Sequence, residues 1–155
     1  MTENSIDIEN IEITKLESYL CVEELLRRRV LTKTSSDFLT FVRYVAPDLV
    51  HDWKMGKHIK IISDKLQKIE SGEIKRLMVF LPPRSSKSVI CSKLFPAWYI
   101  GRNPQHEILT VSHSDQLSSD FGRSVRDIVN TDKFSNIFPA VSLRADVRAA
   151  GKWKT

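Results

Sequence analysis

The sequence is poor in the features that mark secreted, membrane and metal-binding proteins. Its two cysteines, Cys21 and Cys91, are far apart and in no metal-ligand spacing, which indicates reduced, mostly buried thiols. No run approaches the roughly 18 to 20 apolar residues that span a bilayer, and residues 1–10 lack the basic start and apolar core of a secretory signal. Repeats and low-complexity segments are absent as well. We therefore expect a cytoplasmic protein with no membrane partner.

The composition of the 155 residues is that of a globular protein with a hydrophobic core. The formal net charge is +5, but the charge is unevenly distributed. Acidic residues crowd the first 24 positions, and the chain is basic from Arg27 onward, most densely at Arg27–Arg29. This balance permits a nucleic-acid partner without establishing one, and the arginine run itself is more typical of a solvated helix end than of a phosphate contact.

Apolar residues spaced three and four apart predict helices over the first part of the chain. The predicted helices cover about residues 6–30, 34–46 and 59–70. Thr34, Ser35 or Ser36 is the expected N-cap of the second helix, and Pro47 its stop. Gly72 lies just past the third helix, as a terminating glycine does. We expect a helical N-terminal region over residues 1–72.

The pattern changes at Arg76. Residues 77–81 form an uninterrupted apolar run of strand length that ends at two prolines, and residues 107–111 form a second one. Helices are predicted after each run, the first kinked at Pro96 and ending at Gly101, the second with a capping-box-like start at Ser112. This order of strand, helix, strand and helix predicts an α/β fold with a parallel sheet over residues 73–155.

Residues 81–88, Leu-Pro-Pro-Arg-Ser-Ser-Lys-Ser, stand where a phosphate-binding loop would, between an apolar strand and an apolar helix. In such loops backbone N–H groups hold phosphate, a lysine reaches the β- and γ-phosphates, and a serine or threonine binds Mg²⁺. The G-x-x-x-x-G-K-[ST] pattern, however, has glycine where this chain has Leu81 and Ser86. The residues alone therefore leave two interpretations open: a phosphate site, or a polar loop whose Ser85 or Ser86 merely caps a helix.

A series of landmarks resembles the ATPase region of phage terminase large subunits. In chain order they are Trp53 and His58, RLMVFLPPRSSKS, FPAW, GRNP, ILTVSHS, FGRSVRDIV, IFP and GKWKT. No single landmark is specific to this family. Their order and spacing from Phe38 to Thr155 are specific to it. The family has a deviant Walker A loop of the Pro-Pro-Arg-x-x-Lys-Ser kind, often with glycine before the lysine, so only Ser86 departs from it. The resemblance implies an incomplete P-loop NTPase domain that follows the helical region.

The resemblance also implies an ATP-driven motor for viral DNA packaging, with ATP and Mg²⁺ as cofactors. Its partners would be double-stranded DNA, the terminase small subunit and the portal, in the cytoplasm of the bacterial host cell. The two competing hypotheses are a helical adaptor or nucleic-acid-binding module with an inert Lys-Ser loop, and a non-functional prophage remnant.

Carried over residue by residue, the resemblance implies that Arg84 and Lys87 are the catalytic cations near the γ-phosphate. Ser88 would hold Mg²⁺, and the backbone N–H groups of residues 85–88, including Ser85 and Ser86, would cradle phosphate.

The family's adenine contact lies ahead of the first strand. Trp53 and His58 are the candidates for this contact, although packing of the third helix explains both equally well.

The sequence contains no apolar strand that ends in Asp-Glu, the Walker B element that orders Mg²⁺ and positions the attacking water. The acidic cluster of the family's nuclease is not present either. We therefore expect an N-terminal fragment of a terminase large subunit, ending before the Walker B strand.

We predict that the isolated chain has no appreciable ATP hydrolysis. Arg84, Lys87 and Ser88 would hold the triphosphate but would not activate water, and a water-activating group is worth about 10² to 10⁴-fold in rate. Steady-state phosphate release should match that of the Lys87→Ala variant. Turnover well above this blank would assign the missing role to a carboxylate such as Asp115.

Overall fold

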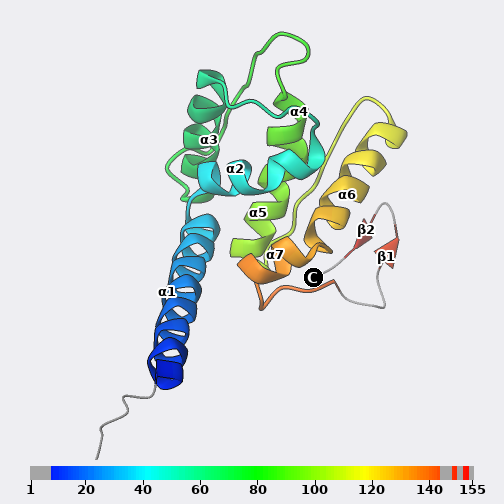
Figure 1. Cartoon of the computed structure of the whole chain (residues 1–155). Coiled ribbons are helices and arrows are strands. Elements are labelled where there is room, and N and C mark those ends of the chain that lie inside the picture. Colours follow the sequence, from blue (N-terminus) through cyan, green and yellow to red (C-terminus); the bar gives the residue numbers. More distant parts are fainter. Residues whose placement is uncertain (1–7, 144–147, 150–151, 154–155) are drawn as a thin grey trace, which may run out of the picture.

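The computed structural model describes residues 8–143, 148–149 and 152–153, with side chains over 19–143. Ile6, at the start of the first predicted helix, and Gly151, Lys154 and Thr155 of the last landmark lie outside the described residues. The described part is mainly helical (Figure 1). Its helices are α1 (Ile8–Ser36), α2 (Phe38–Leu49), α3 (Lys57–Glu70), α4 (Lys87–Val89), the π-helical η1 (Ile90–Leu94), α5 (Phe95–Arg102), α6 (Asp115–Val129) and α7 (Asp132–Ile137). None of these described helices combines the length and apolar character needed to cross a membrane.

The predicted α/β fold with a parallel sheet is wrong. The strands among the described residues are β1 (Arg148–Ala149) and β2 (Lys152–Trp153), which pair antiparallel. Residues 77–81 and 107–111, predicted as parallel strands, have no ladder partner within the described part of the chain.

The physical reason is visible in the burial of the first of these segments. Leu77, Val79 and Leu81 are partly buried against the helical core, whereas Met78 and Phe80 are 82% and 84% exposed. The alternation of a strand is therefore present, but one row of side chains packs on helices and the other faces solvent. An apolar run predicts burial on both faces, and here only one face is buried.

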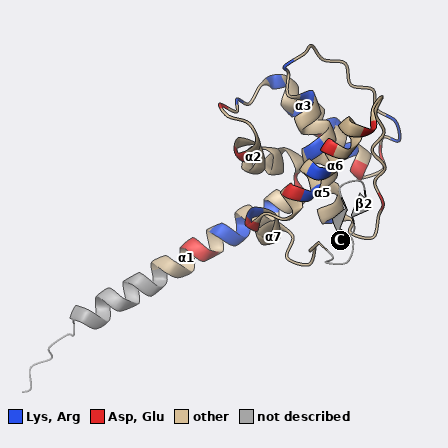
Figure 2. Ribbon diagram, turned by 90° about the vertical axis from the view of Figure 1, so that its right-hand side faces the viewer, with Lys and Arg blue, Asp and Glu red and all other residues tan. Residues whose placement is uncertain are grey.

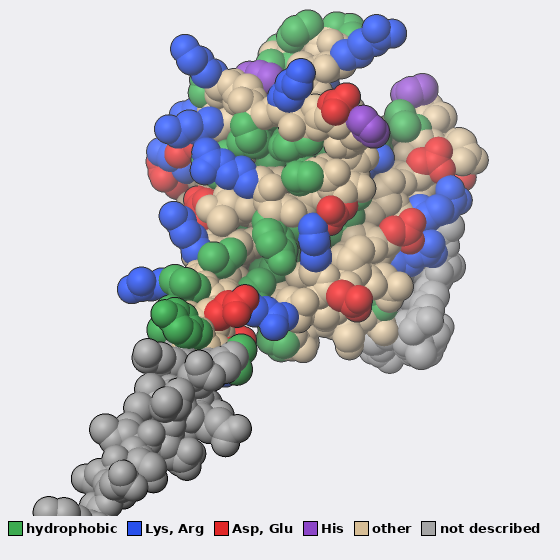
Figure 3. All heavy atoms as spheres, viewed as in Figure 1, with side chains coloured by type: hydrophobic (Ala, Val, Ile, Leu, Met, Phe, Trp, Pro, Cys, Tyr) green, Lys and Arg blue, Asp and Glu red, His purple; other side chains and the backbone are tan. Residues whose placement is uncertain are grey.

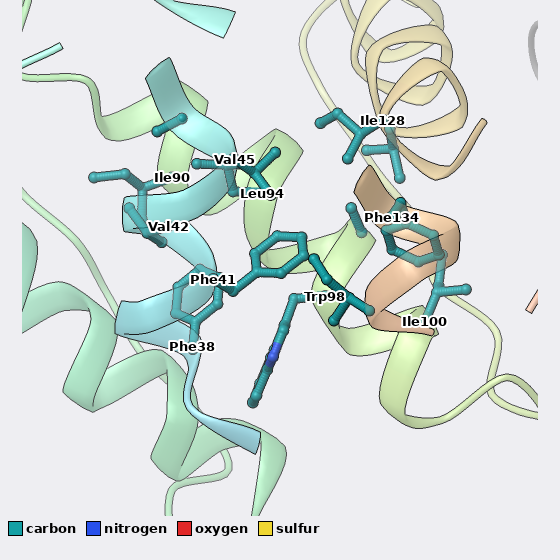
Figure 4. Packing of buried hydrophobic residues seen from close by; sticks show 14 of the residues in the cluster. Phe38, Phe41, Val42, Val45, Ile90, Leu94, Trp98, Ile100, Ile128 and Phe134 are labelled. Carbon is teal, nitrogen blue, oxygen red and sulfur yellow. The ribbon is translucent and has the colours of Figure 1, made fainter. Parts of the chain in front are cut away.

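The core is an aromatic cluster between α2 and α5 (Figure 4). Phe38, Phe41 and Trp98 are fully buried, with ring centroids 5.2 Å apart for Phe38 and Trp98 and 6.4 Å apart for the two phenylalanines. The Trp98 indole N–H donates to the Ser35 carbonyl oxygen at 3.1 Å, which satisfies the one polar atom of this side chain. Residues on both sides of the predicted boundary at residue 72 contribute to this core, and the boundary itself stays a prediction.

Helix ends follow local capping chemistry, and the structure corrects several of the predicted ends. Asp37, rather than Thr34, Ser35 or Ser36, caps α2 by accepting from the Thr40 N–H at 2.7 Å. Pro47 lies inside α2 and does not stop it, because a proline in the last turn still allows Val50 to bond to Ala46.

The start of α6 and the end of α3 also follow known capping patterns. Ser114, rather than Ser112, caps α6 by accepting from the Leu117 N–H. Gly72 has a φ of 77°, the left-handed conformation predicted for the residue after α3.

The helical run from Lys87 to Arg102 contains a π turn directly before Pro96. Phe95 donates to the Ile90 carbonyl, which widens the turn where the proline ring would meet the carbonyl four residues earlier. The prediction that this helix ends at Gly101 is wrong, because α5 continues to Arg102 and Asn103 is its C-cap. A Cβ at Gly101 would come within 2.5 Å of the Phe138 ring, so this glycine allows close packing of Phe138 on α5.

We predict a large effect of alanine substitution at Phe38 and a small effect at Phe80. Phe38→Ala should lower the free energy of unfolding by about 3–5 kcal/mol, because it leaves a cavity in the core. Phe80→Ala should change it by less than about 0.5 kcal/mol, because that side chain is exposed. Urea denaturation measures both. An equally large loss at Phe80 would indicate that residues 77–81 are buried on both faces, as in a sheet.

Candidate phosphate-binding loop

The loop at residues 82–88 follows the apolar run 77–81, includes the first two residues of α4 and lies at the top of the molecule in Figure 1. Lys87 and Ser88 are exposed and form the first turn of the helical run that continues through η1 and α5. Arg84 is exposed as well, so the loop presents two cations to solvent. The sequence predicts a helix that starts at Lys87, and the structure places Lys87 and Ser88 in the first turn of α4, with Arg84 in the loop before it.

Two loop residues other than glycine have left-handed backbones. The φ angles are 62° at Arg84 and 60° at Ser86, while Ser85 and Lys87 have negative φ. Such an alternation turns neighbouring N–H groups toward one side, and concavities of this kind bind anions. Left-handed conformations cost about 1–3 kcal/mol outside glycine, and they concentrate at functional sites.

Ser86 occupies the position of the second glycine in the phosphate-loop pattern. Its φ and ψ of 60° and 15° are values that glycine adopts without strain. The Ser86 side chain makes no cap hydrogen bond to α4. Ser85 does not cap the helix in the usual way either, because its hydroxyl donates to the Pro82 carbonyl at 2.7 Å. The first N–H groups of this helix therefore keep their capacity to bond with a ligand.

His58 supports the loop from α3. Its Nε2 lies 3.2 Å from the Ser85 carbonyl oxygen, which fixes the loop backbone at the residue between the two left-handed ones. The resemblance implies His58 as a candidate for the adenine contact, and the structure places its ring against the backbone of the loop at Ser85.

Gly56 is a contributor to this site that the sequence reasoning missed. A Cβ at this residue would lie 2.5 Å from the His58 ring. A glycine two residues before the histidine, at the start of α3, was the available signal.

Trp53, the other adenine candidate, has a different environment. Its indole N–H donates to the Met55 sulfur at 3.3 Å, and the ring is partly buried against the core. The structure thus associates His58 with the loop and gives Trp53 a packing role.

Cys91 lies one helical turn after Lys87. Burial raises the pKa of its thiol above the ordinary value, and the positive charge of Lys87 opposes that rise without cancelling it. The thiol is therefore protonated at neutral pH and is no candidate nucleophile.

Over the described part of the chain, no three His, Cys, Asp or Glu side chains are grouped so that they could hold a metal ion. The chemistry of the loop, two cations and a row of helix-start N–H groups, fits a polyphosphate. A magnesium ion would have to be held by the phosphates together with the Ser88 hydroxyl.

Comparison of the chain with protein-family models, with curated proteins and with solved structures gives no match.

We predict that glycine is tolerated at Ser86 and not at Ser88. Ser86→Gly should leave the free energy of unfolding unchanged or raise it by up to about 2 kcal/mol, because glycine removes left-handed strain of about 1–3 kcal/mol and costs about 0.4–1 kcal/mol in chain entropy. Ser88→Gly should lower it by about 0.5–1 kcal/mol, since Ser88 is in the helix with negative φ. Equal losses in urea denaturation would contradict the left-handed backbone at Ser86.

Proposed function

We propose that the loop at residues 82–88 binds the phosphates of ATP, with Mg²⁺, as the nucleotide site of a terminase-like DNA-packaging protein. The observation that carries this proposal is the left-handed backbone at Arg84 and Ser86 directly before Lys87 and Ser88. Strained backbones of this kind concentrate at functional sites, and here two of them lie within three residues of the Lys87–Ser88 pair.

Each group in the loop has a role in phosphate binding. Lys87 would contact the β- and γ-phosphates as a point charge, and Arg84 would add a second cation near the γ-phosphate. The backbone N–H groups of residues 85–88 would donate to phosphate oxygens, and the positive end of the helix would favour the negative charge. Bound Mg²⁺ would neutralise phosphate charge, with the Ser88 hydroxyl as its protein ligand.

The contact that His58 of α3 makes with the loop fits phosphate binding as well. Phosphate binding requires N–H groups whose directions are fixed before the ligand arrives, since ordering a loop on binding lowers affinity. The contact of His58 with the Ser85 carbonyl holds the centre of the loop, and the Ser85 hydroxyl bond to Pro82 holds its beginning.

The wider role rests on the resemblance to terminase large subunits. In that role the chain would belong to an ATP-driven motor that translocates double-stranded DNA in the cytoplasm of a bacterial host cell. The terminase small subunit and the portal would be its protein partners. The net charge of +5 and the basic composition from Arg27 onward are consistent with a DNA partner.

A helical nucleic-acid-binding module with an inert Lys-Ser loop is the second candidate. The helical character of the described fold favours it, because the predicted nucleotide-binding sheet is not there. Nucleotide binding that depends on Mg²⁺ and on Lys87 separates the two candidates.

We predict that Lys87→Ala weakens Mg-ATP binding at least about tenfold, because hydrogen bonds to charged groups contribute about 1.5–3 kcal/mol. Isothermal titration calorimetry with Mg-ATP measures the affinity, and circular dichroism should show unchanged helix content.

Lys65→Ala is the matched control. Lys65 is an exposed lysine on α3, seven positions after His58, so this variant removes the same charge without changing the loop or the histidine that supports it. Its affinity should equal that of the unmodified chain. Equal affinity in both variants would show that the loop does not bind the nucleotide.

A further inference from the structure

The peptide group between Ser85 and Ser86 is held in one orientation from α3. The Nε2 atom of His58 lies 3.2 Å from the Ser85 carbonyl oxygen. A carbonyl oxygen can only accept, so Nε2 carries the hydrogen and donates it. The carbonyl is thereby directed toward the His58 ring. In a trans peptide the following N–H points the opposite way, so the Ser86 N–H is directed away from α3.

The next peptide group is fixed from the helical run. The Ser86 carbonyl accepts from the Ile90 N–H at 3.0 Å, so the Lys87 N–H points back toward the loop. Neither the Ser86 nor the Lys87 N–H donates to an acceptor in the part of the chain that the structure describes. Two adjacent donors are therefore available to a ligand, and each is oriented through the carbonyl of its own peptide group.

The first of these peptide groups has an alternative orientation that serine would favour. Turning it over would take the φ of Ser86 from 60° into the negative range preferred by residues other than glycine. The Ser85 carbonyl oxygen would then face the ligand in place of the Ser86 N–H, and it would repel phosphate. The bond from His58 opposes this change, because the turned peptide would lose it.

Gly56 provides the space that the His58 ring occupies. A Cβ on Gly56 would lie 2.5 Å from Cε1 and 2.6 Å from Nδ1 of that ring. The backbone of Gly56, with φ of −88° and ψ of 159°, is extended and suits any residue. The requirement for glycine at this position therefore comes from the histidine ring.

We propose that His58 is a positioning residue for phosphate: through the Ser85 carbonyl it keeps the Ser86 N–H turned toward the ligand. This inference rests on the proposed nucleotide site and identifies the group that orients one of its donors. Gly56 contributes indirectly, by leaving room for the ring.

Charge on this side of the molecule is a separate source of attraction for a nucleotide. Lys and Arg side chains gather at the top and along the side that carries α3 (Figures 2 and 3). Exposed cations with no ion-pair partner among the described residues are Lys54, Lys57, Lys60, Arg84 and Lys87. The test must therefore change the hydrogen bond without depending on the charge of the ring.

The affinity test uses two replacements of His58, with isothermal titration of Mg-ATP. His58→Phe keeps an aromatic ring but has no donor, and it should weaken binding at least about tenfold. His58→Gln is uncharged and has an amide that can donate to the Ser85 carbonyl, so its affinity should stay close to that of the unmodified chain. Unweakened binding by the Phe variant, or a Gln variant as weak as the Phe variant, would overturn the proposal.

His106→Ala is the matched control. It also removes a histidine with one hydrogen bond, here to the Tyr99 hydroxyl at 3.0 Å, beyond the other end of the helical run that begins at Lys87. Its affinity for Mg-ATP should be unchanged. A loss equal to that of His58→Phe would overturn the proposal, since it would show a general effect of losing such a contact.

Gly56→Ala tests the same contact from the other side. It should weaken Mg-ATP binding as His58→Ala does, because the added Cβ displaces the ring. In a His58→Ala background it should cause no further loss, since no ring is left to displace. Additive losses would overturn the role assigned to Gly56.

A measurement without nucleotide separates this inference from the proposed function. The ¹³C resonance of the Ser85 carbonyl should shift in His58→Phe and in Gly56→Ala, because the hydrogen bond is lost, and should stay in place in His106→Ala. An unmoved Ser85 signal would overturn the inference alone. A shifted signal in a chain that binds no Mg-ATP would instead overturn the proposed function, and with it the role of His58 in phosphate binding.

Discussion

The contact between Phe38 and Trp98 is the interaction on which the remaining structure depends. It joins the beginning of α2 to the middle of α5, two elements far apart in sequence, and both side chains are fully buried. The Trp98 bond to the Ser35 carbonyl adds the end of α1 to the same point. The Phe38 N–H donates to the Gln67 side chain at 3.1 Å, which attaches α3. Four helices are thus held together around one pair of rings.

This arrangement also positions the candidate site. The buried residues Ile59 and Ile62 hold α3 on the core, and Ile90 and Leu94 hold the helical run that begins at Lys87. Both ends of the interaction between His58 and the loop are therefore fixed by apolar packing. A loop supported in this way can keep Ser86 in a left-handed conformation, because the surrounding contacts outweigh the local strain.

The sequence predicted helices well where one face is buried and the spacing is regular. Ile59, Ile62 and Leu66 show this for α3. Residues 77–81 show where such prediction fails, because a strand requires a distant partner that a local apolar run does not specify. The role of Gly101 also depended on a distant residue, Phe138, and was therefore wrongly assigned to helix termination.

The candidate site was predictable only in part. Lys87 and Ser88 at a helix start follow from the local pattern, as does the importance of position 86. The contact of His58 with Ser85 joins residues 27 positions apart and follows from packing, so the sequence could associate the two only through a resemblance. The positions of His58 against the loop and of Trp53 against the core likewise depend on tertiary packing, which a local pattern does not specify.

The most direct measurement of the central claim is a two-dimensional ¹H–¹⁵N nuclear magnetic resonance titration of the labelled chain with Mg-ATP. If the loop cradles phosphate, the largest shift changes should occur at the backbone amides of Ser85, Ser86, Lys87 and Ser88, because these N–H groups would donate to phosphate oxygens. Changes confined to the arginine run of α1, with the loop amides unmoved, would show nonspecific attraction of an anion and would contradict the assignment.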